Sequence, residues 1–403
     1  MPSKVPDMVI LALSRWDAPY SSTAFSLAKA LSKEQRVFLI DNPFTWKDFI
    51  LGLNRAQIRK RWKAFLLRKG RVSIPLNDFP QLYICVPPLM LPINWLPKGK
   101  IYRFLSKINQ RKMKGFIQRT LKKYSIDSFH FLNIFNPFYP ISRKDVPTAL
   151  STSYYSVDKI SESVYIKKHG SYLEKDLLGK MNLLFATSTA LKEELENHTE
   201  RVVNFLPNAA ETSFFQKALE KEFERPTIFG SADQKAVLYV GAIGLRIDFE
   251  LLESVIKEYP HFRFIFIGPK GNQYDPVLEK YEQVHFSGAI PQEQLLPYFH
   301  HASAAIIPFK VNPLTAAIYP LKIHEYLAAG LAVVSTPFSE DINAFKEKIF
   351  LTQNHFSFGK LIEKAIQENT KSLRQKRSLA ASQHSWDSRA SELKALLDHF
   401  TLG

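Results

Sequence analysis

The chain has 403 residues, of which 45% are hydrophobic and 23% charged. These values are typical of a folded protein of two or three domains and exclude wholesale disorder. The single cysteine, Cys85, excludes a disulfide framework and a cysteine-based zinc site within the chain. No apolar run approaches the roughly 18 residues of a membrane-spanning helix, and the N-terminus lacks a signal-peptide pattern. We therefore expect a cytoplasmic protein.

The net charge of +16 is concentrated in one region. Residues 47–123 contain 19 Lys or Arg and only two acids, a local charge of +17. Two stretches, 55–71 and 98–123, alternate these cations with apolar residues at helical spacing. Such helices suit an anionic membrane surface. A solvated helix face and a nucleic-acid phosphate backbone are the alternatives, but the chain has no nucleic-acid-binding motif, so we expect no nucleic acid partner. The predicted lipid contacts are Arg59, Lys60, Arg61, Trp62 and Lys63.

Strand-like and helix-like runs alternate along the whole chain. The strands expected in the first half are 8–13, 37–40, 82–86, 129–135, 148–155, 182–188 and 201–208. Those expected in the second half are 236–242, 262–269, 284–288, 304–309, 332–336 and 349–352. Amphipathic segments between them, such as 23–31 and 248–258, predict crossover helices and parallel strands. The pattern predicts an α/β protein with two Rossmann-like, doubly wound domains facing across a cleft.

The domain boundaries follow from a break in this alternation. Residues 211–235 are polar and charged with little strand signal, so we expect a linker there. The N-terminal domain would then span 1–210 and carry the basic helices. A C-terminal domain would span 236–383, and residues 384–403 would form a final helix that packs back on the first domain.

Several strands of the second domain end in residues suited to an anionic ligand. Gly241 and Ala242 follow one strand, and glycines let backbone N–H groups approach a phosphate. Arg246 lies shortly after them. Another strand leads into the turn-rich stretch 308–315, which holds Lys310 and three further candidate contacts, Asn312, Leu314 and Thr315. Turn capping is the alternative role for Asn312 and Thr315.

The run PLKIHEYLAAGLAVVST, residues 320–336, resembles the donor-nucleotide motif of GT-B glycosyltransferases, in particular the large retaining family 4. The stretches 185–215, 237–243, 284–309 and 384–393 are similar to further family segments in the same order. The resemblance covers about residues 182–397, and within the family it is nearest to bacterial surface-polysaccharide transferases of the teichuronic-acid type.

This resemblance implies roles for individual residues. Glu325 would bind the ribose hydroxyls of a nucleotide sugar, and the backbone near Ile290 would contact the base. Lys310, Lys322 and Arg246 would stabilise the charge of the diphosphate leaving group. Lys322 lies three residues before Glu325, so an ordinary ion pair on one helix face is the alternative.

The acceptor half shows less in its sequence. We expect acceptor contacts from Arg15, Trp16 and Asp17 after the first strand and from Tyr154 and Tyr155 near the end of another. The catalytic candidates are three polar residues at or near strand ends: Asp158, Asn133 and Asn136. Asp158 would orient or deprotonate the acceptor hydroxyl; a plain turn residue is the alternative.

The predicted function is sugar transfer from a nucleotide-diphosphate sugar to a lipid-linked or polysaccharide acceptor at the inner face of the plasma membrane. The resemblance implies retention of configuration, no bound metal and no cofactor. A nucleotide-sugar 2-epimerase of the same fold and a non-catalytic binding protein remain alternatives. Ala317 stands where the family often has a second glutamate, which favours the non-catalytic alternative.

Overall fold

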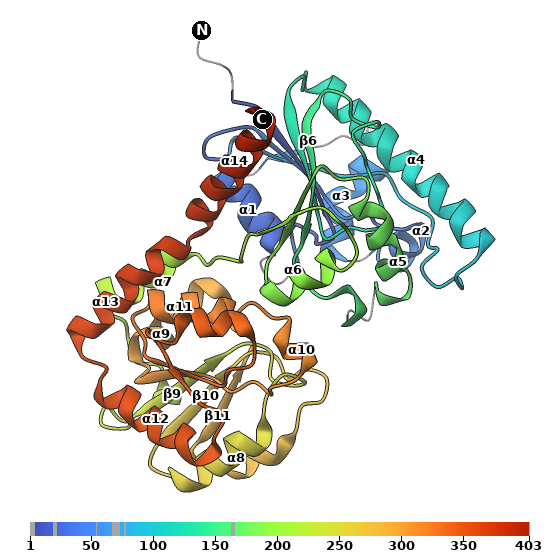
Figure 1. Ribbon diagram of the computed structural model, residues 1–403. Coiled ribbons are helices and arrows are strands. Elements are labelled where there is room, and N and C mark those ends of the chain that lie inside the picture. The colour runs from blue at the N-terminus through green and yellow to red at the C-terminus, as the bar shows by residue number, and fades with distance from the viewer. Residues whose placement is uncertain are drawn as a thin grey trace. The chain divides into compact units, whose positions relative to one another are not determined.

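The computed structural model describes residues 5–18, 22–53, 55–66, 73–75, 78–162 and 166–402 (Figure 1). The chain divides into two compact units. Unit 1 comprises Met1–Pro207 and Arg389–Gly403, and unit 2 comprises Asn208–Ser388.

Unit 1 is built on an eight-stranded sheet with the order β3-β4-β2-β1-β5-β6-β7-β8. Its strands are β1 (Asp7–Ala12), β2 (Val37–Ile40), β3 (Ser73–Pro75), β4 (Leu82–Cys85), β5 (Phe129–Ile134), β6 (Ala149–Ser156), β7 (Leu183–Ala186) and β8 (Val203–Phe205). All neighbours pair in parallel except β3, which runs antiparallel to β4. In register, Met8 faces Val37 on one side and His130 on the other. The chain leaves β1 toward β2 and later returns to β5, so the switch point of the sheet lies between β1 and β5.

Helices cover the sheet of unit 1. They are α1 (Thr23–Leu31), α2 (Trp46–Leu51), α3 (Ala56–Leu66), α4 (Lys100–Lys123), α5 (Lys167–Leu178) and α6 (Thr189–Glu196), with the short 3-10 helix η1 (Ile160–Glu162). The long helix α4 buries Met113, Phe116 and Ile117 against alternate residues of β1, β2 and β5. This spacing of three and four residues is the apolar stripe of an amphipathic helix.

Unit 2 is built on a six-stranded parallel sheet with the order β11-β10-β9-β12-β13-β14. Its strands are β9 (Ala236–Val240), β10 (Arg263–Ile267), β11 (Val284–Gly288), β12 (Ala304–Ile307), β13 (Val333–Ser335) and β14 (Phe350–Leu351). The central strands are buried along their length, as expected when helices cover both faces. Here the switch point lies between β9 and β12, where Leu238 pairs with Ala305.

Two groups of helices cover this second sheet (Figure 1). The α-helices are α7 (Thr212–Glu220), α8 (Phe249–Glu258), α9 (Leu296–His301), α10 (Pro313–Ala316), α11 (Leu321–Ala328), α12 (His355–Gln367) and α13 (Lys371–Ala381). The last helix, α14 (Trp386–Leu402), belongs to unit 1 from Arg389 onward. The 3-10 helices are η2 (Thr227–Phe229), η3 (Pro276–Lys280), η4 (Gln292–Gln294), η5 (Glu340–Phe345) and η6 (Ser382–His384). α8 packs against α12, whereas α7 contacts α9, α11 and α13.

The predicted α/β class with two doubly wound domains is confirmed, because the sheet of unit 2 is parallel and that of unit 1 is parallel apart from β3. The predicted linker 211–235 is wrong. Residues 212–220 form α7, and Phe215 is buried in the core of unit 2 against Phe299. The many charges of this stretch suggested a linker, but they lie on an amphipathic helix whose apolar face packs in the core of unit 2. None of the described helices is long and apolar enough to span a bilayer.

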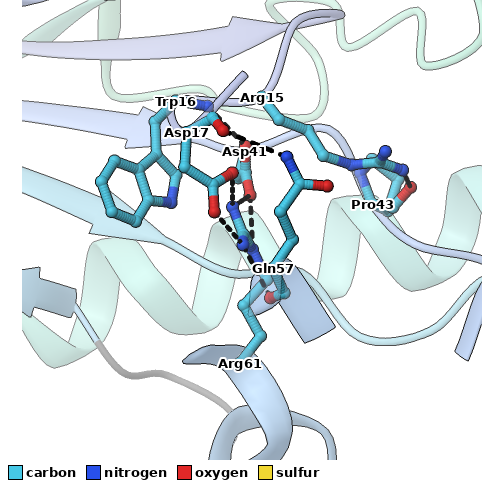
Figure 2. A network of polar contacts seen from close by, with 7 residues as sticks. All are labelled: Arg15, Trp16, Asp17, Asp41, Pro43, Gln57 and Arg61. Atoms are coloured by element: carbon cyan, nitrogen blue, oxygen red, sulfur yellow. Dashed lines mark hydrogen bonds and ion pairs between the residues drawn. The ribbon is translucent and has the colours of Figure 1, made fainter. Parts of the chain in front are cut away.

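A buried ion network holds the loop after β1 (Figure 2). Arg61 of α3 has a fully buried side chain and lies between Asp17 and Asp41, whose carboxylates are also buried. Its Nη2 donates to Asp17 Oδ1 and to Asp41 Oδ2, both at 2.7 Å. The backbone N–H of Trp16 donates to the other oxygen of Asp41 at 3.2 Å. The network therefore joins the loop after β1, the end of β2 and α3.

These contacts correct two predictions from the sequence. Arg61 was predicted to bind lipid, but its guanidinium is 0% exposed, so it does not reach a membrane surface. Asp17 was predicted to bind the acceptor, but both of its oxygens accept hydrogen bonds from Arg61. A surface position was predicted for Arg61 because it stands in a run of cations. The two aspartates that pair with it inside the protein are distant in sequence.

Replacing Arg61 by Met leaves two buried carboxylates without their partner, so R61M should lower the free energy of unfolding by about 3–5 kcal/mol. The control is R59M, which removes an exposed cation from the same helix and should change it by less than about 0.5 kcal/mol. Urea unfolding followed by circular dichroism measures both values. An effect of R61M as small as that of R59M would contradict the proposed role of the network.

Candidate functional site

The loop after β9 forms one rim with the loops after β10 and β12. On one side, Ile243 N–H donates to Pro269 O and Leu245 N–H donates to Asn272 O, both at 3.0 Å. On the other side, Lys310 N–H donates to Arg246 O at 2.9 Å. The rim lies at the carboxyl edge of the sheet, at its switch point, where open α/β sheets bind ligands.

Two glycines allow this close packing of loops. Gly268 has φ of +147°, and a Cβ there would lie 1.9 Å from the carbonyl oxygen of Gly241. A Cβ on Gly244 would lie 2.5 Å from Asn272 O. Gly268 N–H also donates to Gly288 O at 2.8 Å, which adds the loop after β11 to the rim. Ile290, the predicted base contact, is half-buried in that loop.

Two cations stand on the rim. The side chains of Arg246 and Lys310 are both exposed, and the hydrogen bond between their backbones keeps the two residues together. Gly241 and Ala242 open the same loop. The rim therefore combines two cations with the loop at the end of β9, which is an arrangement suited to an anionic ligand.

The stretch after Lys310 has a structural role that the sequence left open. Asn312 caps α10, since its Oδ1 accepts from Thr315 N–H at 3.0 Å. Thr315 is fully buried, and its hydroxyl donates to Lys310 O at 2.5 Å. The prediction that Thr315 contacts the ligand through its side chain is therefore wrong. Leu314 lies half-buried in α10.

Helix α11 is fixed against the end of β9. The hydroxyl of Tyr326 accepts a hydrogen bond from Val240 N–H at 2.8 Å, and burial raises the pKa of this tyrosine well above its ordinary value. Tyr239 adds a second brace, because its hydroxyl donates to Ala242 O at 3.0 Å. Neither tyrosine was predicted from the sequence, because a tyrosine in an apolar helix or strand cannot be told from an ordinary core residue by its position in the pattern.

Glu325, next to Tyr326, pairs with Lys322. Lys322 Nζ donates to Glu325 Oε2 at 2.7 Å, and the two side chains are 32% and 13% exposed. The predicted ion pair on one helix face is therefore present. The carboxylate is still partly accessible at the turn of α11 that Tyr326 holds beside β9.

The candidates of unit 1 are mostly structural. Asn133 and Asn136 are fully buried. Asn133 Oδ1 accepts from Asn136 N–H at 3.0 Å, and Asn136 Nδ2 donates to Ala12 O at 3.1 Å. Both amides thus shape the turn after β5, and the catalytic roles predicted for them are wrong. Asp158 is exposed after β6, and its Oδ1 accepts from Lys159 N–H at 2.8 Å.

The predicted acceptor tyrosines are also buried. Tyr154 donates to Glu174 Oε1 at 2.6 Å, and Tyr155 donates to the carbonyl oxygen of Leu206. Neither side chain is exposed, so the prediction that they bind the acceptor is wrong. The guanidinium carbon of Arg15 lies 3.6 Å from the centroid of the Phe44 ring. Trp16, the next residue, is half-buried.

Of the predicted lipid contacts other than Arg61, the side chains of Arg59, Lys60 and Trp62 are exposed on α3. The side chain of Lys63 lies outside the described residues. In the described part of the chain, no group of three His, Cys, Asp or Glu side chains is placed to hold a metal ion.

The burial of Glu174 predicts a pH dependence of stability. Burial raises the pKa of Glu174 to about 7, from an ordinary value of 4.5. The folded chain therefore holds a proton that the unfolded chain releases, so stability should fall as pH rises from 4.5 to 7, by an amount on the order of 2–3 kcal/mol. Urea midpoints at pH 5 and pH 8 should show this fall in the wild type and a smaller one in E174Q. Equal pH slopes for the two proteins would refute the assignment.

Unit 2 contains the part of the chain that is similar to a known protein family. Residues 234–367 match the family model described as group 1 glycosyl transferases. This segment spans the rim and the Lys322–Glu325 pair. A protein of Bacillus subtilis (strain 168), named as the teichuronic acid biosynthesis glycosyltransferase TuaH, is 28% identical over 101 residues. That match spans 24% of this chain and 25% of the relative.

Solved structures match nearly the whole chain. Sucrose-phosphate synthase from Thermosynechococcus elongatus has a TM-score of 0.63 at 14% identity, over 97% of this chain and 98% of that one. The Anabaena protein HepE, solved with UDP and glucose, has a TM-score of 0.58 at 14% identity, over 97% and 100%. The E. coli trehalose-6-phosphate protein bound with UDP-2-fluoro glucose reaches 0.65 at 11% identity, over 97% and 98%. At these identities the likeness establishes the fold: the chain has a GT-B fold, and its residues 234–367 are similar to the group 1 glycosyl transferases.

Proposed function

We propose that this chain transfers a sugar from a nucleotide-diphosphate sugar to a lipid-linked or polysaccharide acceptor, with retention of configuration and without a bound metal. The observation that carries the proposal is the rim of unit 2. It brings the exposed Arg246 and Lys310 together at the switch point and holds Glu325 on the helix braced to the end of β9. Two of the similar solved structures contain UDP or a UDP sugar. Their ligands support a uridine nucleotide as the first donor to test.

The residues of the rim suit the charges of such a donor. A carboxylate that is mostly buried needs hydrogen-bond donors, and the two hydroxyls of a ribose would supply them to Glu325. The diphosphate would lie near Arg246 and Lys310. Cations fixed before the reaction stabilise the negative charge that develops on a departing diphosphate. In this account Lys322 orients Glu325 through its 2.7 Å ion pair.

The acceptor side of the proposal rests on Asp158. Of the three predicted catalytic residues, Asp158 is exposed, whereas Asn133 and Asn136 are buried. We propose that Asp158 orients or deprotonates the acceptor hydroxyl. The relative from teichuronic acid biosynthesis supports a surface-polysaccharide acceptor. An acceptor of this kind is consistent with a protein that works at the inner face of the plasma membrane.

Nucleotide binding is tested by thermal shift with UDP, GDP, ADP, dTDP and CMP. A ligand that binds only the folded state stabilises it by about 2.7 kcal/mol at 100 times its dissociation constant. We expect UDP to raise the melting temperature of the wild type by several degrees and to have little effect on E325A. The matched control is E363A, which removes an exposed glutamate from α12 of the same unit and should keep the full shift.

The same panel separates binding from a purely structural ion pair. If Glu325 serves only Lys322, then E325A lowers the melting temperature without ligand but keeps the UDP shift, and the proposed donor site is wrong. Product analysis after incubation with UDP sugars and membrane extract separates transfer from epimerisation, because a transferase releases UDP whereas an epimerase returns a UDP sugar.

A further inference from the structure

Unit 1 has a surface on which large apolar side chains and cations are mixed. Trp95, Ile101 and Phe104 lie in the loop before α4 and in its first two turns, and they are 71%, 70% and 66% exposed. Four cations lie among them: Lys98, Lys100, Arg103 and Lys107, all exposed. We call these seven residues the α4-tip surface. Large exposed apolar side chains gathered in one place usually mark an interaction site.

The exposed indole of Trp95 stands on a well-anchored backbone. Lys168 Nζ donates to Trp95 O at 2.7 Å, and His169 Nε2 lies 3.0 Å from Leu96 O. The ring of Tyr102 stacks on His169 with centroids 3.7 Å apart. Burial lowers the pKa of His169, so its ring is neutral near pH 7 and donates to Leu96 O. The loop therefore has a fixed backbone and still presents a tryptophan to solvent.

All charged residues of α4 are cationic. Its 24 residues include nine Lys or Arg and no acidic residue. Gly99 precedes the helix without a side-chain cap, and Lys100 and Arg103 stand in the first turn. Cations at this end of a helix are repelled by the helix dipole. An anionic partner would relieve that repulsion, and anionic lipid headgroups attract each basic residue near the surface.

A second group of exposed apolar residues lies next to this surface. In α2 the side chains of Trp46, Ile50 and Leu51 are 48%, 64% and 70% exposed. A cavity of about 230 Å³ lies between the two groups, and its lining includes Lys47, Trp95 and Tyr102. Figure 1 shows α2 and α5 beside the amino end of α4. The mixed apolar and cationic surface thus extends from α4 to α2.

We propose that the α4-tip surface docks on an anionic lipid bilayer, with Trp95, Ile101 and Phe104 at the level of the headgroups. Tryptophan and aliphatic side chains flanked by cations are the composition of peripheral membrane contacts. This inference rests on the proposed transfer to a membrane-linked acceptor and names the surface that meets the membrane. The contacts predicted on α3 stay a separate prediction, since Arg59, Lys60 and Trp62 are exposed there and only Arg61 is buried.

The test is co-sedimentation of the full chain with vesicles of phosphatidylcholine alone or with 30% phosphatidylglycerol. The variant K100Q/R103Q/K107Q should bind the anionic vesicles about 100-fold more weakly than the wild type, at roughly fivefold per cation. The matched control R119Q/K122Q/K123Q removes three exposed cations from the other end of the same helix, about 27 Å away along its axis. It should weaken binding by less than threefold.

The apolar contribution is tested by W95S/I101S/F104S, which should also weaken binding at least tenfold. Each variant should keep the wild-type melting temperature and its UDP shift, so a failure of docking is distinguished from a failure of the donor site. The proposal is overturned if both cation variants lose binding equally, if neither does, or if only R59Q/K60Q does. Binding to single-stranded RNA without binding to anionic vesicles would likewise overturn it.

Discussion

The hydrogen bonds that join the loop after β9 to its neighbours are the constraint on which the proposed donor site depends. They exist because the sheet of unit 2 reverses its strand order between β9 and β12, so the chain leaves these two strands in opposite directions. The glycines then let the loops approach closely, with Gly268 against the carbonyl of Gly241. Arg246 and Lys310 are held together by backbone geometry, so their positions do not depend on contacts between the two side chains.

The tyrosine braces extend this rim to α11. The Tyr326 hydroxyl accepts a hydrogen bond from the N–H of Val240, the last residue of β9. Glu325, one residue earlier, carries the carboxylate that we propose binds the ribose. The rim therefore keeps the backbones of Arg246 and Lys310 together, and the brace from Tyr326 keeps Glu325 on a helix held at the end of β9. Such preorganisation is the main source of electrostatic stabilisation in transfer reactions. In unit 1 the buried Arg61 network fixes the loop after β1 in the same manner, although there it uses ions in place of backbone hydrogen bonds.

The strands and the fold class were predicted well from the sequence, because short apolar runs between turns are typical of buried strands. Prediction failed where a residue's partner lies far away in the chain. Arg61 stands among exposed cations, and nothing local shows that Asp17 and Asp41 bury it. Asn133 and Asn136 sit near a strand end like ligand contacts, but their amides bind backbone groups. In unit 2, the role of Glu325 was predicted from the family resemblance and stays a prediction, whereas its ion pair with Lys322 three residues away is confirmed.

The central claim is that Glu325 binds the ribose of a nucleotide sugar on the rim of unit 2. A crystal structure of the full chain with UDP tests it most directly. The account predicts the ribose hydroxyls within hydrogen-bond distance of the Glu325 carboxylate, the diphosphate beside Arg246 and Lys310, and the base near Ile290. UDP bound elsewhere on the chain, or on the rim without contact to Glu325, would contradict the account.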